Sequence, residues 1–491
     1  MTSGAWDLCV VGAGPGGYAA AMRAHDLGKR VVVVERGQVG GAGIHAGALS
    51  SKTMWHLSND YAVAARTDRG YHAIGGIEVS YPSVIESVRT AVSERRSLLD
   101  RQLASLAAPS ANGGVVTLVR GSGRFVSPHA LEVKRLDGTI EMIEATNFLL
   151  APGSQPRVPD GIPVDGTLVV TSDQIEAFPA FPESMVIVGA GVVGCEYATI
   201  FANFGKTRIH IIDRQPRILP FEDEDVAEEV AASFESMGVV IHRASKLESL
   251  QVVDGKVEYV ITNAEGKTET IRVERALVSV GRAPATKDLG LEAAGVKLDR
   301  GGGVVVENTR STTAPHIYAA GDATMDIALV NVAELEGRYA VESMYGLEPR
   351  PIRYEALSAI MFLKPEVASV GLNELKAKEQ KIPYRVGVVA NRLIGRNIAM
   401  RETHGFIKLL ASPETHRILG LRVVGPEASS TIQGIAFLID QEATLEDIDH
   451  CVHPHPAITE GVQECARMLL GRSVMKFDVF GREGMMRCGD G

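Results

Sequence analysis

The sequence has few cysteines and no long apolar run. Its 491 residues include five cysteines at wide spacings, whereas secreted proteins held by disulfides carry dense, even-numbered sets. No segment approaches the roughly 18 consecutive apolar residues of a membrane-spanning helix, and the first residues lack the basic and apolar regions of a signal peptide. We therefore expect an unexported protein of the reducing cytoplasm, with no membrane span.

Basic residues are also in the minority. The chain has 50 Lys and Arg against 60 Asp and Glu, a net charge of -10. Binding to nucleic acid needs a basic face, so this balance argues against a nucleic-acid partner, although a local basic patch remains possible. At roughly 100 to 200 residues per domain, the length predicts three domains, give or take one.

Glycine, by contrast, is abundant, and the first glycines form a dinucleotide-binding fingerprint. A predicted strand over residues 7–11 leads into Gly12, Gly14 and Gly17, and a helix and a second strand follow, ending at Glu35. The first glycine permits a tight turn, the second lets a pyrophosphate approach the helix N-terminus, and the third lets helix and strand pack closely. Glu35 is then placed to hold ribose hydroxyls.

The same order of strand, glycine turn, helix and strand returns at Gly189, Gly191 and Gly194, and ends at Asp213. Two such folds in one chain predict two dinucleotides between which electrons pass. Because a 2′-phosphate would meet a carboxylate at Asp213, we predict NAD(H) as the preferred nucleotide. The neighbouring Arg214 keeps NADP(H) possible.

Shorter signals complete the pattern. Gly153 and Gly281 each follow a strand and mark crossings between the two nucleotide folds. Asp322, after another strand and a glycine, can accept a hydrogen bond from a sugar or ribitol hydroxyl. From about residue 351 strands alternate with two helices and no glycine fingerprint appears, which predicts a separate α+β domain. Residues 473–491 are polar and glycine-bearing, and they predict a poorly ordered tail.

These motifs resemble the flavoprotein disulfide reductases, the class I pyridine nucleotide-disulfide oxidoreductase family. The resemblance covers residues 6 to about 470 and includes the two fingerprints together with Ser51-Lys52, Gly153-Ser154, Glu196, Gly281-Arg282, Gly321-Asp322, His453, His455 and Glu460. It implies FAD in the first fold, a nicotinamide nucleotide in the second, and a C-terminal domain that forms a two-fold homodimer. It further implies that His455 and Glu460 reach into the partner's active site, and that Gly41 belongs to the cofactor-binding set.

The resulting fold class is α/β, with two Rossmann-like dinucleotide-binding domains and a C-terminal α+β dimerisation domain. We expect the FAD domain to be discontinuous. The expected ranges are 1–155 and 281–350 for FAD, 156–280 for NAD(P), and 351–472 for dimerisation.

One segment departs from the family pattern. Family members carry two cysteines, spaced Cys-x4-Cys, just before the Ser-Lys pair, and these pass electrons from flavin to a disulfide. Here Gly43 and Ala48 occupy the two positions before Lys52. Because thiol-disulfide exchange requires a thiolate, this departure excludes the ordinary disulfide reductase mechanism unless another cysteine substitutes.

The cysteines that are present are poor substitutes. Cys9 and Cys195 fit buried structural thiols, and Cys488 lies in the expected tail. Cys451 and Cys465 flank the segment of His453, His455 and Glu460, which leaves a metal site or a relocated redox pair open. Their spacing matches no tight ligand pattern, so we predict no metal.

The resemblance implies a role for each remaining polar group. Lys52, paired with Glu196, would lie beside flavin N5 and favour the electron-rich reduced flavin. His455, oriented by Glu460, would act as a general acid and base or remain as an interface residue. His45 would either donate a hydrogen bond to the electron acceptor or pack as a satisfied helix histidine.

Three functions therefore stay open, besides a cysteine-dependent reduction by an unforeseen pair. The first is an FAD-dependent NADH oxidoreductase resembling lipoamide dehydrogenase, whose acceptor is a quinone-like small molecule, a redox dye or a protein carrier. The second is a soluble pyridine-nucleotide transhydrogenase. The third is a flavin-binding subunit without catalytic activity.

Overall fold

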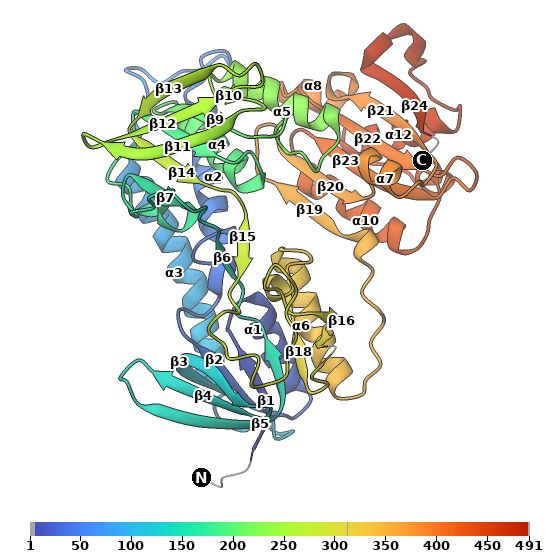
Figure 1. Cartoon of the computed structure of the whole chain (residues 1–491). Coiled ribbons are helices and arrows are strands. Elements are labelled where there is room, and N and C mark those ends of the chain that lie inside the picture. The colour runs from blue at the N-terminus through green and yellow to red at the C-terminus, as the bar shows by residue number, and fades with distance from the viewer. Residues whose placement is uncertain (1–4, 312, 490–491) are drawn as a thin grey trace.

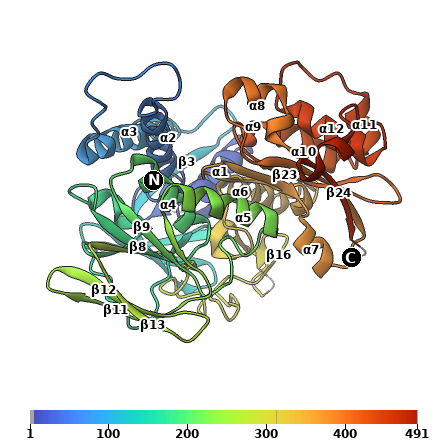
Figure 2. The ribbon, with the colours of Figure 1, turned by 90° about the horizontal axis from the view of Figure 1, so that it is seen from above.

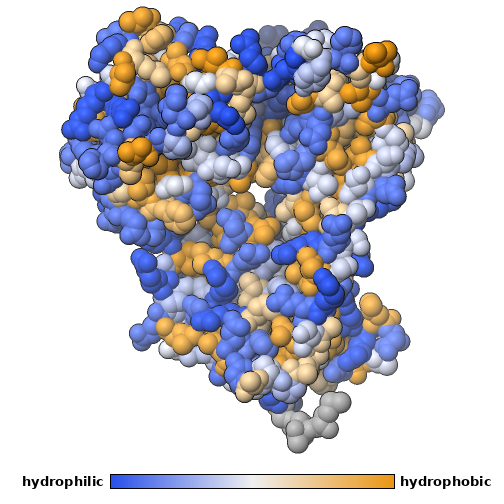
Figure 3. All heavy atoms as spheres, turned by 180° about the vertical axis from the view of Figure 1, so that it is seen from behind, coloured by the Kyte–Doolittle hydropathy of each residue, from blue (hydrophilic) through white to orange (hydrophobic). Residues whose placement is uncertain are grey.

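The computed structural model describes residues 5–311 and 313–489. Three bodies are visible in Figure 1: a first nucleotide fold at the bottom, a second at the upper left, and a C-terminal sheet at the upper right. None of the described helices combines the length and the apolar composition needed to cross a bilayer. The rear face mixes hydrophilic and hydrophobic residues without one dominant apolar area (Figure 3).

The first fold is built on a parallel sheet with β1 at its centre. In order, the parallel strands are β3 (Val115–Ser127), β2 (Arg30–Glu35), β1 (Trp6–Val11), β5 (Ile140–Leu150) and β18 (Ile317–Ala319). The helices α1 (Pro15–Asp26) and α6 (Val330–Met344) contribute to the apolar cluster on one face. The other face packs against the antiparallel hairpin of β3, β4 (Ala130–Arg135) and β5. Because both faces are covered, the valine-rich β2 is buried over most of its length.

The second fold repeats this plan. Its parallel strands are, in order, β10 (Val240–His242), β9 (Arg208–Ile212), β8 (Ser184–Val188), β14 (Arg275–Val278) and β7 (Val169–Thr171). The helices α4 (Val192–Phe204) and α5 (Glu224–Ser236) cover one face. An antiparallel sheet covers the other face and consists of β11 (Lys246–Val253), β12 (Lys256–Thr262) and β13 (Thr268–Val273).

Two connections hold the nucleotide folds together. β6 (Ser154–Pro156) and β15 (Arg282–Pro284) pair antiparallel and run between the two folds (Figure 1), directly after the turns at Gly153 and Gly281. The helices α2 (Ala48–Ala64) and α3 (Tyr81–Ser105) leave the first fold and share an apolar cluster with the second. Figure 2 shows these two helices side by side when the molecule is seen from above.

The C-terminal body is an antiparallel sheet with helices packed against both of its faces. Its strands are, in order, β19 (Ser358–Met361), β20 (Val367–Gly371), β23 (Ile418–Val424), β22 (Phe406–Ala411), β21 (Tyr384–Ala390) and β24 (Gly484–Gly489). The helices are α7 (Glu374–Glu379), α8 (Gly395–Met400), α9 (Ala428–Thr431), α10 (Gln433–Asp440), α11 (Leu445–His450) and α12 (Thr459–Leu469). Short 3₁₀ turns lie at η1 (Gly41–Gly43), η2 (Ser172–Ala177), η3 (Gly321–Ala323), η4 (Tyr354–Ala356) and η5 (Asn391–Leu393). The C-terminal α+β unit that the sequence predicts is confirmed, whereas its start at residue 351 stays a prediction.

The prediction of a poorly ordered tail is wrong for most of residues 473–491. After η6 (Phe477–Val479) and η7 (Gly481–Glu483), β24 pairs with β21 from Val389↔Gly484 to Tyr384↔Gly489 and becomes the edge strand. Phe477 is buried in the C-terminal core. The polar composition predicted disorder, but backbone pairing with β21 and the buried Phe477 side chain order this segment. Residues 490–491 lie outside the described part of the chain.

Candidate active site

The first glycine turn has the shape that a dinucleotide pyrophosphate requires. Gly12 has a φ of +102°, and a Cβ there would lie 2.2 Å from the Ala151 carbonyl oxygen. A Cβ on Gly17 would lie 2.0 Å from the Gly12 oxygen, whereas one on Gly14, at the N-terminus of α1, would meet no protein atom within 4 Å. Gly41 lies against this turn, its Cβ position 3.1 Å from Gly14 Cα. The turn therefore fits FAD, since its open side faces a helix N-terminus.

The second glycine turn repeats the first closely. Gly189 has the same φ of +102°, and a Cβ on Gly194 would lie 2.1 Å from the Gly189 oxygen. Gly191, at the N-terminus of α4, again faces open space. The two turns are thus two equivalent nucleotide cradles in one chain.

An acid closes each cradle in the same way. The Ala13 N–H donates to Glu35 Oε2 at 2.7 Å, and the Ala190 N–H donates to Asp213 Oδ2 at 2.7 Å. Both acids thus stand beside their glycine turns, where ribose hydroxyls would lie. Arg214 is exposed.

Polar side chains from three segments hydrogen-bond to one another where the crossing strands meet the first fold. Arg282 Nε donates to Ser154 Oγ at 2.7 Å, and the Ser154 hydroxyl donates to Asp322. The flanking Gly153 and Gly281 have positive φ values of +70° and +100°. The Ser154 hydroxyl thus links the Asp322 carboxylate to Arg282 beside the two crossing strands.

Lys52 and Glu196 come together across the two nucleotide folds. Lys52 Nζ on α2 lies 2.8 Å and 3.1 Å from the two carboxylate oxygens of Glu196 on α4. Glu196 is buried and also accepts the backbone N–H of Phe362 from the C-terminal body, at 3.1 Å. The ammonium lies 5.0 Å from the centre of the Phe362 ring. The pair is therefore a partly buried junction of all three bodies and not an exposed ion pair.

The segment before Lys52 is not helical until Ala48, where α2 begins. Gly43 ends η1, and a Cβ there would lie 2.7 Å from Pro15 Cγ. His45 lies in the bend between η1 and α2, and its Nε2 is 2.9 Å from the Val39 carbonyl oxygen. The alternative of a helix histidine is thus wrong as to structure, because glycines on both sides interrupt the helix, but the ring does have a hydrogen-bond partner.

His455, just before α12, forms a pair with Glu460 in the first turn of that helix. His455 Nδ1 lies 2.9 Å from Glu460 Oε1, and the Ala457 N–H donates to Glu460 Oε2 at 2.8 Å. Burial opposes ionisation of Glu460, but the Ala457 N–H and His455 outweigh it, and the pKa of Glu460 is lowered. The His455 side chain is 78% exposed in the single chain. The pair therefore presents an oriented imidazole to whatever packs against this face.

The five cysteines lie in different environments. All five are free thiols; Cys9, Cys195 and Cys465 are buried, and burial raises the pKa of each. Cys451 and Cys488 are exposed. Within residues 5–311 and 313–489, the one group of acids spaced for a metal is Asp223, Asp225 and Glu374, and Lys408 Nζ lies within 3.2 Å of each carboxylate.

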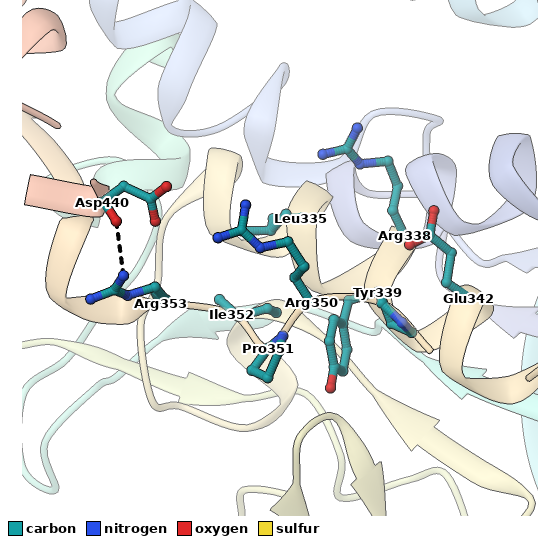
Figure 4. A pocket seen from close by; sticks show the side chains of 10 residues that line it. Leu335, Arg338, Tyr339, Glu342, Arg350, Pro351, Ile352, Arg353 and Asp440 are labelled. Carbon is teal, nitrogen blue, oxygen red and sulfur yellow. Dashed lines mark hydrogen bonds between the residues drawn. The ribbon is translucent and has the colours of Figure 1, made fainter. Parts of the chain in front are cut away.

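A pocket of about 470 Å³ lies away from both glycine turns (Figure 4). It is bounded by α6, by the linker to the C-terminal body and by Asp440 at the end of α10, with Arg353 donating to the Asp440 carbonyl oxygen at 2.8 Å. None of the residues predicted to bind a cofactor lines it.

Sequence reasoning missed three contributors to this region. Phe362 supplies only its backbone N–H and ring, which no motif encodes. Glu336 is buried on α6, and its carboxylate accepts the Gly321 N–H at 2.6 Å next to Asp322. The carboxyl group of Glu176 on η2 is half-buried, and burial raises its pKa against the opposing effects of Ser50, Arg89 and His45. Arg282 could be identified from the sequence, because it directly follows the predicted Gly281 turn.

Comparison with known proteins agrees with this geometry. Residues 6–337 match the model described as "Pyridine nucleotide-disulphide oxidoreductase", and residues 357–466 match its dimerisation domain. The chain belongs to this family. Its members among the curated proteins include the mitochondrial dihydrolipoyl dehydrogenase of Schizosaccharomyces pombe, 31% identical over 94% of this chain and 89% of that protein. The leghemoglobin reductase of Glycine max is 30% identical over 94% and 87% of the two chains.

Solved structures of family members superpose over nearly the whole chain. LpdA from Mycobacterium tuberculosis has a TM-score of 0.85 at 28% identity, and covers 94% of this chain and 99% of its own. The flavoprotein disulfide reductase RclA from Escherichia coli, at 23% identity and a TM-score of 0.82, shares the fold over 94% of this chain and 100% of its own. The protein is thus a flavin-dependent oxidoreductase that uses FAD and a pyridine nucleotide, and its dimerisation domain indicates a homodimer.

Proposed function

We propose that this family member passes a hydride from NADH to FAD and onward to an acceptor that is not a disulfide, of which a quinone-like molecule is the favoured class. One observation carries the proposal: the segment of η1 and early α2 that the family resemblance assigns to the redox cysteines holds Gly43 and Ala48. Neither side chain can exchange a thiol with a substrate.

The other cysteines offer no replacement pair. Cys465 donates its thiol to the Ile407 carbonyl oxygen at 3.5 Å inside the C-terminal core, whereas Cys451 is exposed. Raised pKa values keep the buried thiols protonated, and a protonated thiol is a poor nucleophile. The relative from Glycine max is, by its name, a reductase of leghemoglobin, which supports a non-disulfide acceptor for this chain.

The chain's own residues divide the work. Bound FAD would supply the two-electron chemistry. Lys52, held by Glu196, provides a positive charge that favours reduced flavin. The partner subunit contributes its own copy of the His455 imidazole, oriented by its own copy of Glu460, as a proton donor and acceptor. Without the partner, each site lacks this imidazole.

NADH is the proposed reductant. Asp213 keeps both carboxylate oxygens at the mouth of the second cradle, since the Ala190 and Gln215 N–H groups hold them at 2.7 Å and 2.8 Å. A 2′-phosphate would meet this negative charge. Asp213→Ala should therefore raise the KM for NADH. It should also reduce the preference for NADH over NADPH, measured as the ratio of the two kcat/KM values.

A transhydrogenase is the second candidate, and exposed Arg214 is the observation that favours it. A guanidinium free to turn towards the cradle could receive the 2′-phosphate of NADP(H) beside Asp213. In that case the two nucleotides take turns at one site.

The deciding experiment is an anaerobic titration of the purified flavoprotein with NADH, followed by mixing with thio-NADP+ or with a soluble quinone. Bleaching by about one equivalent per flavin, with rapid reoxidation by the quinone only, supports the NADH:acceptor reductase. Rapid reoxidation by thio-NADP+ supports the transhydrogenase. Uptake of two equivalents before bleaching is complete reveals a second redox centre and contradicts both.

A further inference from the structure

A phenylalanine of the C-terminal body reaches the pair of Lys52 and Glu196 with both its backbone and its ring. Phe362 lies in the connection between β19 and β20. Its N–H donates to Glu196 Oε1 at 3.1 Å, and its ring lies under the ammonium, with its centre 5.0 Å from Lys52 Nζ. An ammonium within about 6 Å of the centre of an aromatic ring is attracted to the face of that ring. One residue therefore contacts both members of the pair.

The helix that carries Lys52 also holds the Phe362 ring. Trp55 follows three residues after Lys52 on α2, so the two side chains are neighbours on one side of the helix. The rings of Trp55 and Phe362 meet edge to face, with their centres 5.1 Å apart and 83° between their planes. Trp55 Nε1 also donates to the Leu363 carbonyl oxygen at 3.3 Å. These contacts leave the Phe362 ring little freedom to turn away from the ammonium.

Burial strengthens the contact between the ammonium and the ring. Glu196 is 5% exposed, Trp55 is 9% exposed, and the Lys52 side chain is 26% exposed. A cation–π contact is stronger where water is excluded than at an exposed site. The Glu196 carboxylate accepts from Lys52 and from the Phe362 N–H, so the C-terminal body holds both the ammonium and its counter-charge.

The effect of a charge on a nearby flavin depends on where the charge is held. A lysine ammonium sits at the end of a flexible stem of four carbons, and the energy of its interaction with another charge falls with distance. A ring that restricts Lys52 therefore determines how much of its charge acts on the reduced flavin.

We propose that Phe362 is a positioning residue through which the C-terminal body holds the Lys52 ammonium beside the flavin and sets how readily the flavin is reduced. The inference rests on one part of the proposed function, the action of the Lys52 charge on the flavin, and not on the identity of the electron acceptor. The N–H of residue 362 reaches Glu196 whichever side chain is present. A change of side chain there therefore tests the contact with Lys52 alone.

The test measures the midpoint potential of the bound flavin by anaerobic reduction of the holoenzyme against a reference dye. Phe362→Leu keeps the N–H and removes the ring. We expect the equilibrium to shift about fivefold towards oxidised flavin, which lowers the potential of a two-electron couple by about 20 mV. Phe362→Tyr retains an aromatic face and should stay close to the wild type.

Phe406→Leu is the matched control, because Phe406 on β22 is also partly buried and packs against the same apolar cluster as Phe362. Its substitution should lower stability but leave the potential unchanged. Equal shifts of the potential in Phe362→Leu and Phe406→Leu overturn the inference, because they indicate a general effect of lost packing.

Lys52→Met separates a failure of the inference from a failure of the proposed function. It removes the charge itself, so its potential should fall further than that of Phe362→Leu. A lowered potential in Lys52→Met together with a wild-type potential in Phe362→Leu overturns the inference only. A wild-type potential in Lys52→Met overturns the proposed action of the Lys52 charge, and the inference with it.

A double variant shows whether the ring acts through the ammonium. Phe362→Leu should shift the potential in the wild-type background but not in the Lys52→Met background, because no charge is left there for the ring to hold. Equal shifts in the two backgrounds overturn the inference, since the ring would then affect the flavin without Lys52.

Discussion

At the scale of single residues, charge placement decides the chemistry that the nucleotide folds can support. The Lys52 ammonium donates to the buried Glu196 carboxylate, which also accepts the Phe362 backbone N–H from the C-terminal body, so its position depends on all three parts of the chain. The sequence predicted the pairing with Glu196 only through family resemblance. No local pattern could supply it, because the two residues lie on helices of different folds.

Lys52→Met should slow flavin reduction by NADH at least about tenfold, because a fixed positive charge is lost beside the reduced flavin. Stopped-flow absorbance of the holoenzyme measures this step. Since the substitution also leaves Glu196 buried without a counter-charge, Lys52→Met with Glu196→Gln serves as the second variant and should recover stability but not rate. Lys246→Met, which removes an exposed lysine 2.6 Å from Glu248, is the control. A double variant with a wild-type rate would contradict the role of the charge.

At the scale of elements, neighbouring strands of the second fold carry a histidine pair that makes it sensitive to acid. His210 Nδ1 on β9 and His242 Nε2 on β10 are 3.2 Å apart. Burial and the neighbouring His242 and Arg208 lower the pKa of His210 to about 4, and burial lowers that of His242. Both rings therefore stay neutral in the native protein at neutral pH.

The sign of the pH effect follows from proton binding. An unfolded histidine takes up its proton near pH 6.5, whereas native His210 does so only near pH 4. Between these values the unfolded state binds more protons, so stability falls as the pH falls through this window. Tm of the holoenzyme from pH 7.5 to 4.5 should therefore decline less steeply for His210→Gln than for the wild type. His72→Gln, at an exposed histidine, should follow the wild-type slope; identical slopes for all three proteins would exclude the pair as a source of acid sensitivity.

At the scale of the whole molecule, an ion cluster joins the second fold to the C-terminal sheet. Lys408 on β22 is fully buried, with Nζ 2.6 Å from Asp223 and 2.5 Å from Asp225 at the start of α5. Arg487 on β24 also reaches Asp225, at 2.6 Å. Burial opposes ionisation of Asp225, but Lys408 and Arg487 outweigh it and lower its pKa. The C-terminal edge strand thus contributes to holding two bodies together.

Lys408→Met should lower the free energy of unfolding by about 3 to 5 kcal/mol, because it leaves the buried Asp223 carboxylate without its cation. Denaturant unfolding monitored by circular dichroism measures the change. Arg392→Met, which breaks an exposed pair with Glu483, should cost less than about 1 kcal/mol. A similar small loss for Lys408→Met would show that the cluster does not hold the two bodies together.

The dimer that the family match indicates requires an apolar face on the C-terminal body. Phe437 on α10 is 64% exposed and Val452, near His455, is 99% exposed in the single chain. Phe437→Glu should shift the protein towards monomer, measured by light scattering after size exclusion, because a charge would replace apolar contact area. Specific activity should then fall on dilution. Leu136→Glu, at an exposed leucine of the first fold, should remain dimeric; an unchanged dimer in both variants would place the interface elsewhere.

The sequence by itself determined the two nucleotide folds and their order. Gly12 and Gly189 occupy turns with positive φ, and a Cβ on Gly17 or Gly194 would clash with backbone. Because only glycine suits these positions, its presence in the sequence predicts the local backbone geometry. The acids at Glu35 and Asp213 could be predicted for the same reason, since fixed spacing along strand, turn and helix places them.

Tertiary structure decided what local spacing cannot encode. Arg282 donates to Ser154, the Phe362 N–H donates to Glu196, and β24 joins the C-terminal sheet, all through contacts between segments far apart in the chain. Composition predicted a loose tail because it registers polarity but not the backbone pairing available at a sheet edge. The sequence thus fixes which cofactors the folds suit, through short-range geometry, whereas packing between the bodies decides which side chains surround the reacting centre.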